Sequence, residues 1–249
     1  MDKLRGMETF IAVVECGSFT GAASRLGLSA VMVGKSAGTL RVSAPTSFGA
    51  SVIAPLTATF LQAWPAVRVE LDLTNRMVDL VDEGFDLAIR IGEIHQEDLV
   101  ARYLAPYRMV ICAAPAYLAR YGTPGTPEDL ADHLCLSHTV WTARNEWRLP
   151  GVEGEVRWKR DAVLRCNDGY ALRQAAIAGA GLLMQPEVLL ADALASGSLV
   201  RVLEAWTPQP RPVHLLWRQD RRPLPKLTQF IAHLQQGMAD ALTTTRASE

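Results

Sequence analysis

Cysteine is scarce in this 249-residue chain, and none of its four cysteines belongs to a CxxC pair. Their spacing fits no zinc module, so we expect small buried residues in a reducing compartment. The chain also has no HExxH motif, and its five histidines are scattered, with no neighbouring cysteine or paired carboxylate. We therefore predict no metal site, no cofactor and no catalytic activity.

Long apolar runs and an excess of charge are also missing. No stretch approaches the roughly 18 uninterrupted apolar residues of a membrane span, and the N-terminus lacks a basic leader followed by an apolar run. The net charge of -1 gives no global attraction to nucleic acid, so any DNA contact has to come from a local patch. These absences predict a bacterial protein in the cytoplasm that does not enter the membrane.

The first 35 residues carry the pattern of paired helices. Met7, Phe10, Ile11 and Val14 recur at the spacing of one helix face. A second apolar stripe follows over residues 19–26, and the chain then turns through glycine into the start of a third helix. Helix, short glycine-containing turn and helix form the pattern of a helix-turn-helix.

After residue 38 the periodicity changes to alternating strands and helices. The pattern predicts strands at 40–43, 67–73 and 86–92, with a helix at 52–60 and a short helical face at 77–81. This alternation continues to a helix at 225–242 and indicates an α/β fold with right-handed crossovers. We place the crossings between two lobes near Ala113-Ala114 and Arg211-Pro212. Lobe I would hold residues 38–113 and 212–242, and lobe II residues 114–211.

Several strings resemble one family, the LysR-type transcriptional regulators. GSFTGAASRLGLS followed by VMVGK resembles the start of their DNA-binding domain. LRVSAPTSFG, DLAIRIG, LAPYRMVICAAPAYL and GAGLLMQPEV resemble their effector domain. The resemblance implies an α/β, two-lobed effector domain of type-2 periplasmic-binding-protein kind at 38–249, preceded by a truncated helix-turn-helix remnant at 1–37. In the family, a wing and a dimerising helix follow the reading helix, and those segments are missing between Lys35 and Ser36.

The resemblance also assigns DNA-facing residues in the remnant. These would be Ser18, Thr20, Ser29, Met32 and Lys35. A segment of about 35 residues is below the size that usually buries its own core. Losing the dimerising helix also loses an avidity gain of roughly 10²- to 10⁴-fold. We therefore predict that DNA binding is weak or lost.

Candidate ligand-binding residues follow the strand ends, because open α/β sheets bind ligands outside the carboxyl ends of their strands. Hydroxyls, amides and one arginine suit a carboxylate, with Phe48 or Trp147 as an apolar wall. Taken singly, the same residues can also be helix caps, packed side chains or solvated strand ends. The predicted effector-binding residues are Thr46, Ser47, Phe48, Asn75, Arg90, Gly92, His138, Asn167, Asp168 and Gln185.

The sequence thus favours a regulator that senses a small organic effector, either a carboxylate or an aromatic compound, with impaired DNA binding. We expect a homodimer or a higher oligomer. An alternative is a stand-alone sensor, or a dimer partner that titrates a full-length relative. A solute-binding module for transport is disfavoured because no leader peptide is present.

Overall fold

The computed structural model describes residues 38–94, 98–139, 146–151, 154–159, 161–219 and 224–246. Their contacts define two compact units. Unit 1 holds the described residues up to Pro45 together with 52–105 and those from 214 onward. Unit 2 holds residues 46–51 and 106–213. Each unit is built around its own sheet.

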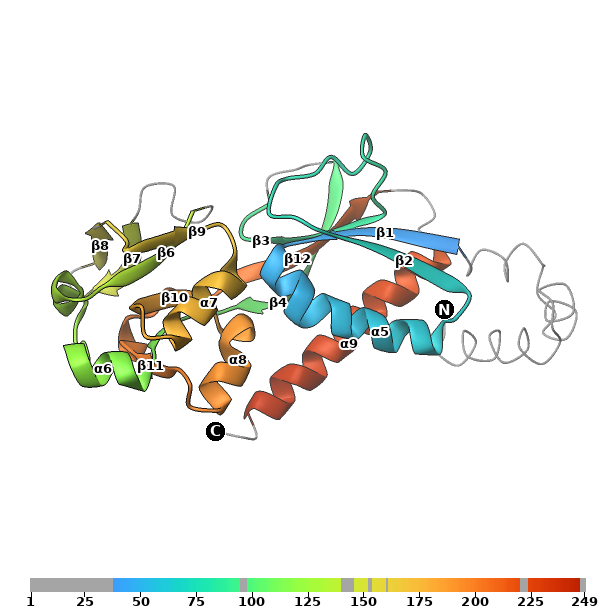
Figure 1. The fold of residues 1–249 in the computed structure, drawn as a ribbon. Coiled ribbons are helices and arrows are strands. Elements are labelled where there is room, and N and C mark those ends of the chain that lie inside the picture. Colours follow the sequence, from blue (N-terminus) through green and yellow to red (C-terminus); the bar gives the residue numbers. More distant parts are fainter. Residues whose placement is uncertain are drawn as a thin grey trace, which may run out of the picture. The chain divides into compact units, whose positions relative to one another are not determined.

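The sheet of unit 1 has the strand order β2-β1-β3-β12-β4 (Figure 1). Strand β1 lies between β2 and β3 and pairs in parallel with both. Strands β12 and β4 continue across the unit boundary. The strands are β1 (Gly38–Ala44), β2 (Val67–Leu73), β3 (Leu87–Ile91), β4 (Leu99–Tyr107) and β12 (Arg211–Arg218).

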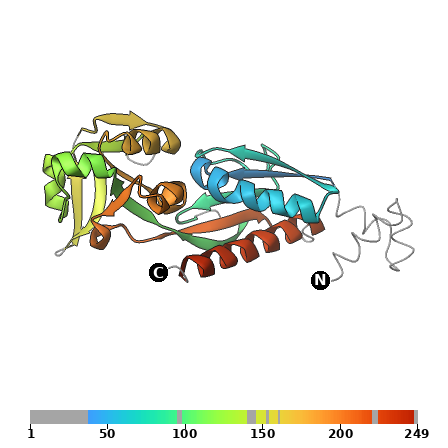
Figure 2. The same cartoon turned by 60° about the horizontal axis from the view of Figure 1, so that its bottom comes forward.

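Two helices, α5 (Ala54–Ala63) and α9 (Pro225–Arg246), pack against each other in unit 1. They lie side by side in both views of the chain (Figures 1 and 2). The rings of Phe60 and Phe230 meet edge to face, with centroids 4.9 Å apart. Gly237 permits this close approach, because an added Cβ would lie 2.3 Å from Leu56 Cδ2.

Between β1 and α5 the chain forms a short helix, α4 (Thr46–Phe48), and then a π-helical turn, η1 (Gly49–Ile53). Pro55 supplies the physical reason for the wider turn. It lacks the N–H that would bond to the carbonyl four residues earlier, and its ring crowds that carbonyl. The hydroxyl of Thr57 donates to the carbonyl of Ile53 at 2.7 Å, within the first turn of α5.

The sheet of unit 2 has the order β11-β5-β10-β6-β9, in which β10 runs antiparallel to β5 and parallel to β6. Its apolar core includes Trp147, Leu172 and Leu190. A hairpin stands beside the sheet, formed by β7 (Glu146–Gly151) and β8 (Gly154–Lys159). The sheet strands are β5 (Met109–Ala113), β6 (Cys135–His138), β9 (Leu164–Cys166), β10 (Leu182–Pro186) and β11 (Val200–Val202).

Helices α7 and α8 contact β10, and α7 also contacts β6 and β9. The turn η2 begins with a capping box in which Thr126 and Asp129 bond reciprocally. The helices of unit 2 are α6 (Pro115–Tyr121), α7 (Gly169–Ile177) and α8 (Glu187–Ala195), with 3-10 turns η2 (Pro127–Asp132) and η3 (Glu204–Trp206).

The structure corrects the sequence-based expectations in part. The prediction of a helical face at 77–81 is wrong, because this segment forms a turn. The Asp79 carboxylate accepts the N–H groups of Val81 and Asp82 at 2.7 and 3.0 Å. The contact units change at residues 105–106 and 213–214, the first before and the second just after the expected crossings near Ala113-Ala114 and Arg211-Pro212, which stay predictions. The cause is the pairing of β5 with β10 and β11, which holds that strand in unit 2.

Candidate functional site

A close approach between four elements of unit 2 brings two predicted polar residues to one glycine. Gly169 is the first residue of α7, and an added Cβ there would lie 3.0 Å from Ser47 Oγ and 3.1 Å from Gln185 Oε1. It would also lie 2.7 Å from Cδ2 of Leu189. The helix backbone therefore meets α4, β10 and α8 at one point, where a larger residue would have to displace the ends of three side chains.

Gln185 is the most unusual member of this group. Its side chain is 0% exposed, and neither its Oε1 nor its Nε2 has a hydrogen-bond partner. A buried polar group left unsatisfied costs about 1–3 kcal/mol, so native structures hold few of them. The site thus presents a free donor and a free acceptor beside the N-terminus of α7.

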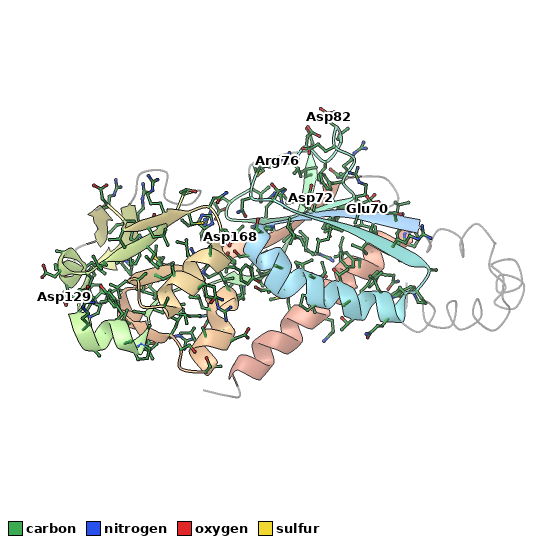
Figure 3. All side chains as sticks on the ribbon, viewed as in Figure 1. Glu70, Asp72, Arg76, Asp82, Asp129 and Asp168 are labelled. Atoms are coloured by element: carbon green, nitrogen blue, oxygen red, sulfur yellow. The ribbon has the colours of Figure 1, made fainter. Side chains whose placement is uncertain are left out.

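Asp168 caps that helix, as the sequence predicted for a helix start. Its carboxylate accepts the N–H of Ala171 at 2.7 Å, and Figure 3 shows it at the junction of β9 and α7. Its own N–H donates to Cys166 Sγ at 3.4 Å. A negative charge therefore already stands at the positive end of the helix.

His138 lies on the neighbouring strand, paired with Cys166 in the β6–β9 ladder, and is 4% exposed. Burial lowers its pKa below 6.5, while the charge of Asp168 and a hydrogen bond to the backbone of Asn167 act in the opposite direction. The imidazole is therefore mainly neutral at pH 7, and it adds no positive charge to this part of unit 2.

Unit 1 holds the one predicted arginine. Arg90 is 6% exposed, its Nη1 donates to the carbonyl of Ile89 at 2.7 Å, and its Nη2 donates to Ser43 Oγ at 2.9 Å. Its Nε has no partner. Among the described residues no carboxylate comes within ion-pair distance of this guanidinium. A buried cation with an unused donor suits an anion.

More distant charges also act on Arg90. Burial lowers its pKa and Arg76 adds to that effect, while Asp72 and Glu83 oppose it. Asp72 and Arg76 are labelled at the end of β2 and in the turn after it (Figure 3). Glu83 binds Arg76 through both carboxylate oxygens and is thus occupied with that partner.

The remaining predicted residues divide between the units. Asn75 is exposed in unit 1, and the carbonyl of Gly92 lies 3.1 Å from His214 Nδ1. In unit 2, Thr46 is half-buried and Asn167 is exposed. Contact of these residues with an effector stays a prediction, and the five predicted DNA-facing residues lie outside the described residues.

The two candidate aromatic walls are both packed inside unit 2. Phe48 is 1% exposed and meets the ring of Tyr107 edge to face at 5.9 Å. Trp147 is 2% exposed and belongs to the apolar core.

Sequence reasoning missed two residues near α4. The hydroxyls of Ser51 and Tyr170 lie 2.8 Å apart and join η1 to α7. Gly169 was not singled out either, because close backbone approach leaves no local pattern in the sequence. In the described part of the chain no set of three or more His, Cys, Asp or Glu side chains is placed to hold a metal ion. None of the helices there is long and apolar enough to cross a membrane.

Two family profiles match the sequence. One, described as LysR substrate binding domain, covers residues 34–239. The other, described as bacterial regulatory helix-turn-helix protein of the lysR family, covers residues 4–41. The two matches overlap at residues 34–41, so no stretch of sequence separates them.

Curated proteins and solved structures give the same result. The HTH-type transcriptional regulator YhjC of Escherichia coli is 30% identical over 207 residues, which are 82% of this chain and 69% of that protein. The activator AaeR of Escherichia coli is 34% identical over 75% of this chain and 61% of its own length. The regulatory domain of CrgA from Neisseria meningitidis superposes with a TM-score of 0.74 at 28% identity, covering 81% of this chain and 99% of that domain. The predicted α/β fold of periplasmic-binding-protein type is confirmed.

Proposed function

This chain is a member of the LysR family of bacterial transcriptional regulators, and from that membership we propose that it senses a small organic effector while its DNA binding is weak or lost. The observation that carries the proposal is Arg90, a buried guanidinium with an unused donor and no ion-pair partner in the described residues. An anionic, carboxylate-bearing effector, aliphatic or aromatic, suits this group.

The effector proposal is tested by calorimetric titration with terephthalate as the probe. Arg90→Met should weaken binding roughly 10- to 100-fold, because a hydrogen bond to a charged group is worth about 1.5–3 kcal/mol. Ser47→Ala and Asn167→Ala should weaken it by smaller factors. Arg68→Met removes the same charge from an exposed site on β2 and should leave the affinity unchanged. If all three site variants bind terephthalate as tightly as the wild type, these residues do not form the effector site.

Loss of DNA binding is supported by the overlap of the two family matches, which leaves no room for a linker helix between them. Selection of bound sequences from a random DNA library should enrich no motif, and residual binding should disappear between 50 and 200 mM salt. The control carries the corresponding segment of a full-length relative after Lys35 and should regain selectivity. Nanomolar, sequence-selective, salt-tolerant binding by the unaltered chain would contradict the proposal.

The same overlap favours a second candidate function, a sensor that pairs with a full-length relative and reduces its activity. Co-expression of the chain with such a relative should yield a mixed dimer on affinity purification. Light scattering of the chain alone should show a homodimer or a higher oligomer. A monomer that also fails to pair would leave only the effector-sensing role.

We further propose that the chain acts in the cytoplasm, and by binding rather than by catalysis. The curated relatives carry the names of transcriptional regulators, which supports both statements. Steady-state turnover of any small molecule that protects the chain against thermal unfolding would refute the second.

A further inference from the structure

We infer that Gln185, beside Ser47 and the N-terminus of α7, receives an uncharged group of the effector that carries both a hydrogen-bond donor and an acceptor, such as a carboxamide or a lactam. The inference rests on the proposed effector-sensing function and deepens it. It names the chemical class that unit 2 accepts, which differs from the anion that suits Arg90 in unit 1.

Gln185 lies beside the N-terminus of α7. The residue is 0% exposed on β10, and its Oε1 lies 3.1 Å from the position of an added Cβ at Gly169. Gly169 opens α7, a nine-residue helix whose first N–H groups lack partners within the helix. An unsatisfied amide is therefore aimed at a helix N-terminus, with the Ser47 hydroxyl 3.0 Å from the same Cβ position.

The charges around this point disfavour a carboxylate. Asp168 already caps α7 and accepts the N–H of Ala171, so a second negative charge would meet the first at the same helix end. His138, which is paired with Cys166 on the next strand, supplies no compensating cation at pH 7, because burial lowers its pKa. The carboxylate of Asp168 thus already occupies the position at the helix N-terminus where a negative charge is stabilised.

The Gln185 amide can both donate and accept hydrogen bonds. Gln185 offers donors on Nε2 and an acceptor on Oε1, and both atoms lack partners. A carboxylate can only accept, so it would bond to Nε2 and leave Oε1 facing a like-charged oxygen. A carboxamide or lactam satisfies both atoms in a pair of antiparallel hydrogen bonds. The match does not depend on which way the amide is turned.

The first test needs no ligand and measures the thermal unfolding midpoint. If Gln185 is unsatisfied in the free protein, Gln185→Leu should raise the midpoint by ~2–6 °C, because the variant buries an apolar side chain of similar size. Gln174→Leu, at an exposed position of α7, is the matched control and should not change the midpoint. A lower midpoint for Gln185→Leu would overturn the inference, since it would mean that the amide is already satisfied.

The second test compares two probes that share one carboxylate, 4-carbamoylbenzoate and terephthalate. The wild-type chain should bind 4-carbamoylbenzoate about tenfold or more tightly than terephthalate. In Gln185→Leu that preference should fall to less than about threefold. Arg90→Met should weaken the binding of both probes and keep the preference for the amide.

The outcomes separate the two proposals. If terephthalate binds as tightly as 4-carbamoylbenzoate and Arg90→Met weakens both, the effector proposal stands and this inference fails. If Arg90→Met changes neither affinity but the amide preference depends on Gln185, the inference stands and the role of Arg90 fails. Binding of neither probe counts against both.

Discussion

Replacing Gly181 by alanine should strongly destabilise unit 2, because its missing side chain is what lets β10 start beside β6. An added Cβ would lie 2.5 Å from the carbonyl oxygen of Leu134 and 2.9 Å from its carbon. That oxygen accepts the N–H of Leu182 at 2.8 Å, the bond that opens the parallel pairing of the two strands. To reach an ordinary contact of 3.4 Å the carbonyl must retreat by about 0.9 Å.

The size of the effect follows from three contributions. Overpacking costs ~1–3 kcal/mol, and a weakened backbone hydrogen bond ~0.5–1.5 kcal/mol. Alanine recovers ~0.4–1 kcal/mol by restricting the unfolded chain. At the middle of these ranges, Gly181→Ala should lose about 2 kcal/mol of unfolding free energy and lower the thermal midpoint by ~4–8 °C.

Gly179→Ala provides the matched control for this prediction. The residue lies two positions earlier in the same loop with φ +83°, and an added Cβ there has nothing within 4 Å. Only the backbone conformation opposes alanine, at about 1 kcal/mol. Urea and thermal unfolding of both variants check the difference. If Gly181→Ala loses no more stability than Gly179→Ala, contact with the Leu134 carbonyl is not what selects glycine.

Three further predictions concern charged and capping groups. Hydrogen bonding by Arg76 lowers the pKa of Glu83 to about 2, so its carboxylate stabilises the fold above its ordinary pKa of 4.5 and stops doing so as the pH falls through 2. Urea unfolding should therefore show Glu83→Gln less stable than wild type at pH 6 and equally stable near pH 2. Burial lowers the pKa of His138, so the unfolded chain binds its proton more readily, and wild type should lose stability relative to His138→Gln as the pH falls from 7 to 5. Asp168→Ala removes the bond to Ala171 and should cost ~1 kcal/mol in urea unfolding.

The strands and helices that were predicted correctly are those whose pattern is local. The strict alternation in 67–73 predicted β2, and the apolar spacing in 225–242 predicted α9. Strand β4 was missed because its exposed residues precede its buried ones, which gives no alternation. Helix α6 was not predicted; Pro115 stands at its start, where its missing N–H is not needed.

The candidate site was predictable only as a set of separate positions. Strand-to-helix turns pointed to Ser47 and Asp168, and the end of a strand pointed to Gln185. That Gly169 stands against both Ser47 and Gln185 depends on how α4, more than 100 residues earlier in the chain, packs beside β10 and α8. The missing ion pair of Arg90 likewise depends on which carboxylates the fold brings near, and Glu83 is bound to Arg76 instead.

Two residues that meet at the start of α7, Gln185 and Gly169, destabilise the folded state. An unsatisfied Gln185 costs about 1–3 kcal/mol, and leucine in its place would remove that cost with a side chain of similar size. Gly169 opens a helix with the residue that loses most backbone entropy on folding. Packing against Leu189 explains the glycine, but no contact in the described structure explains the amide. Because most proteins are only marginally stable, a polar group retained at such a cost is best explained by a bound partner that satisfies it.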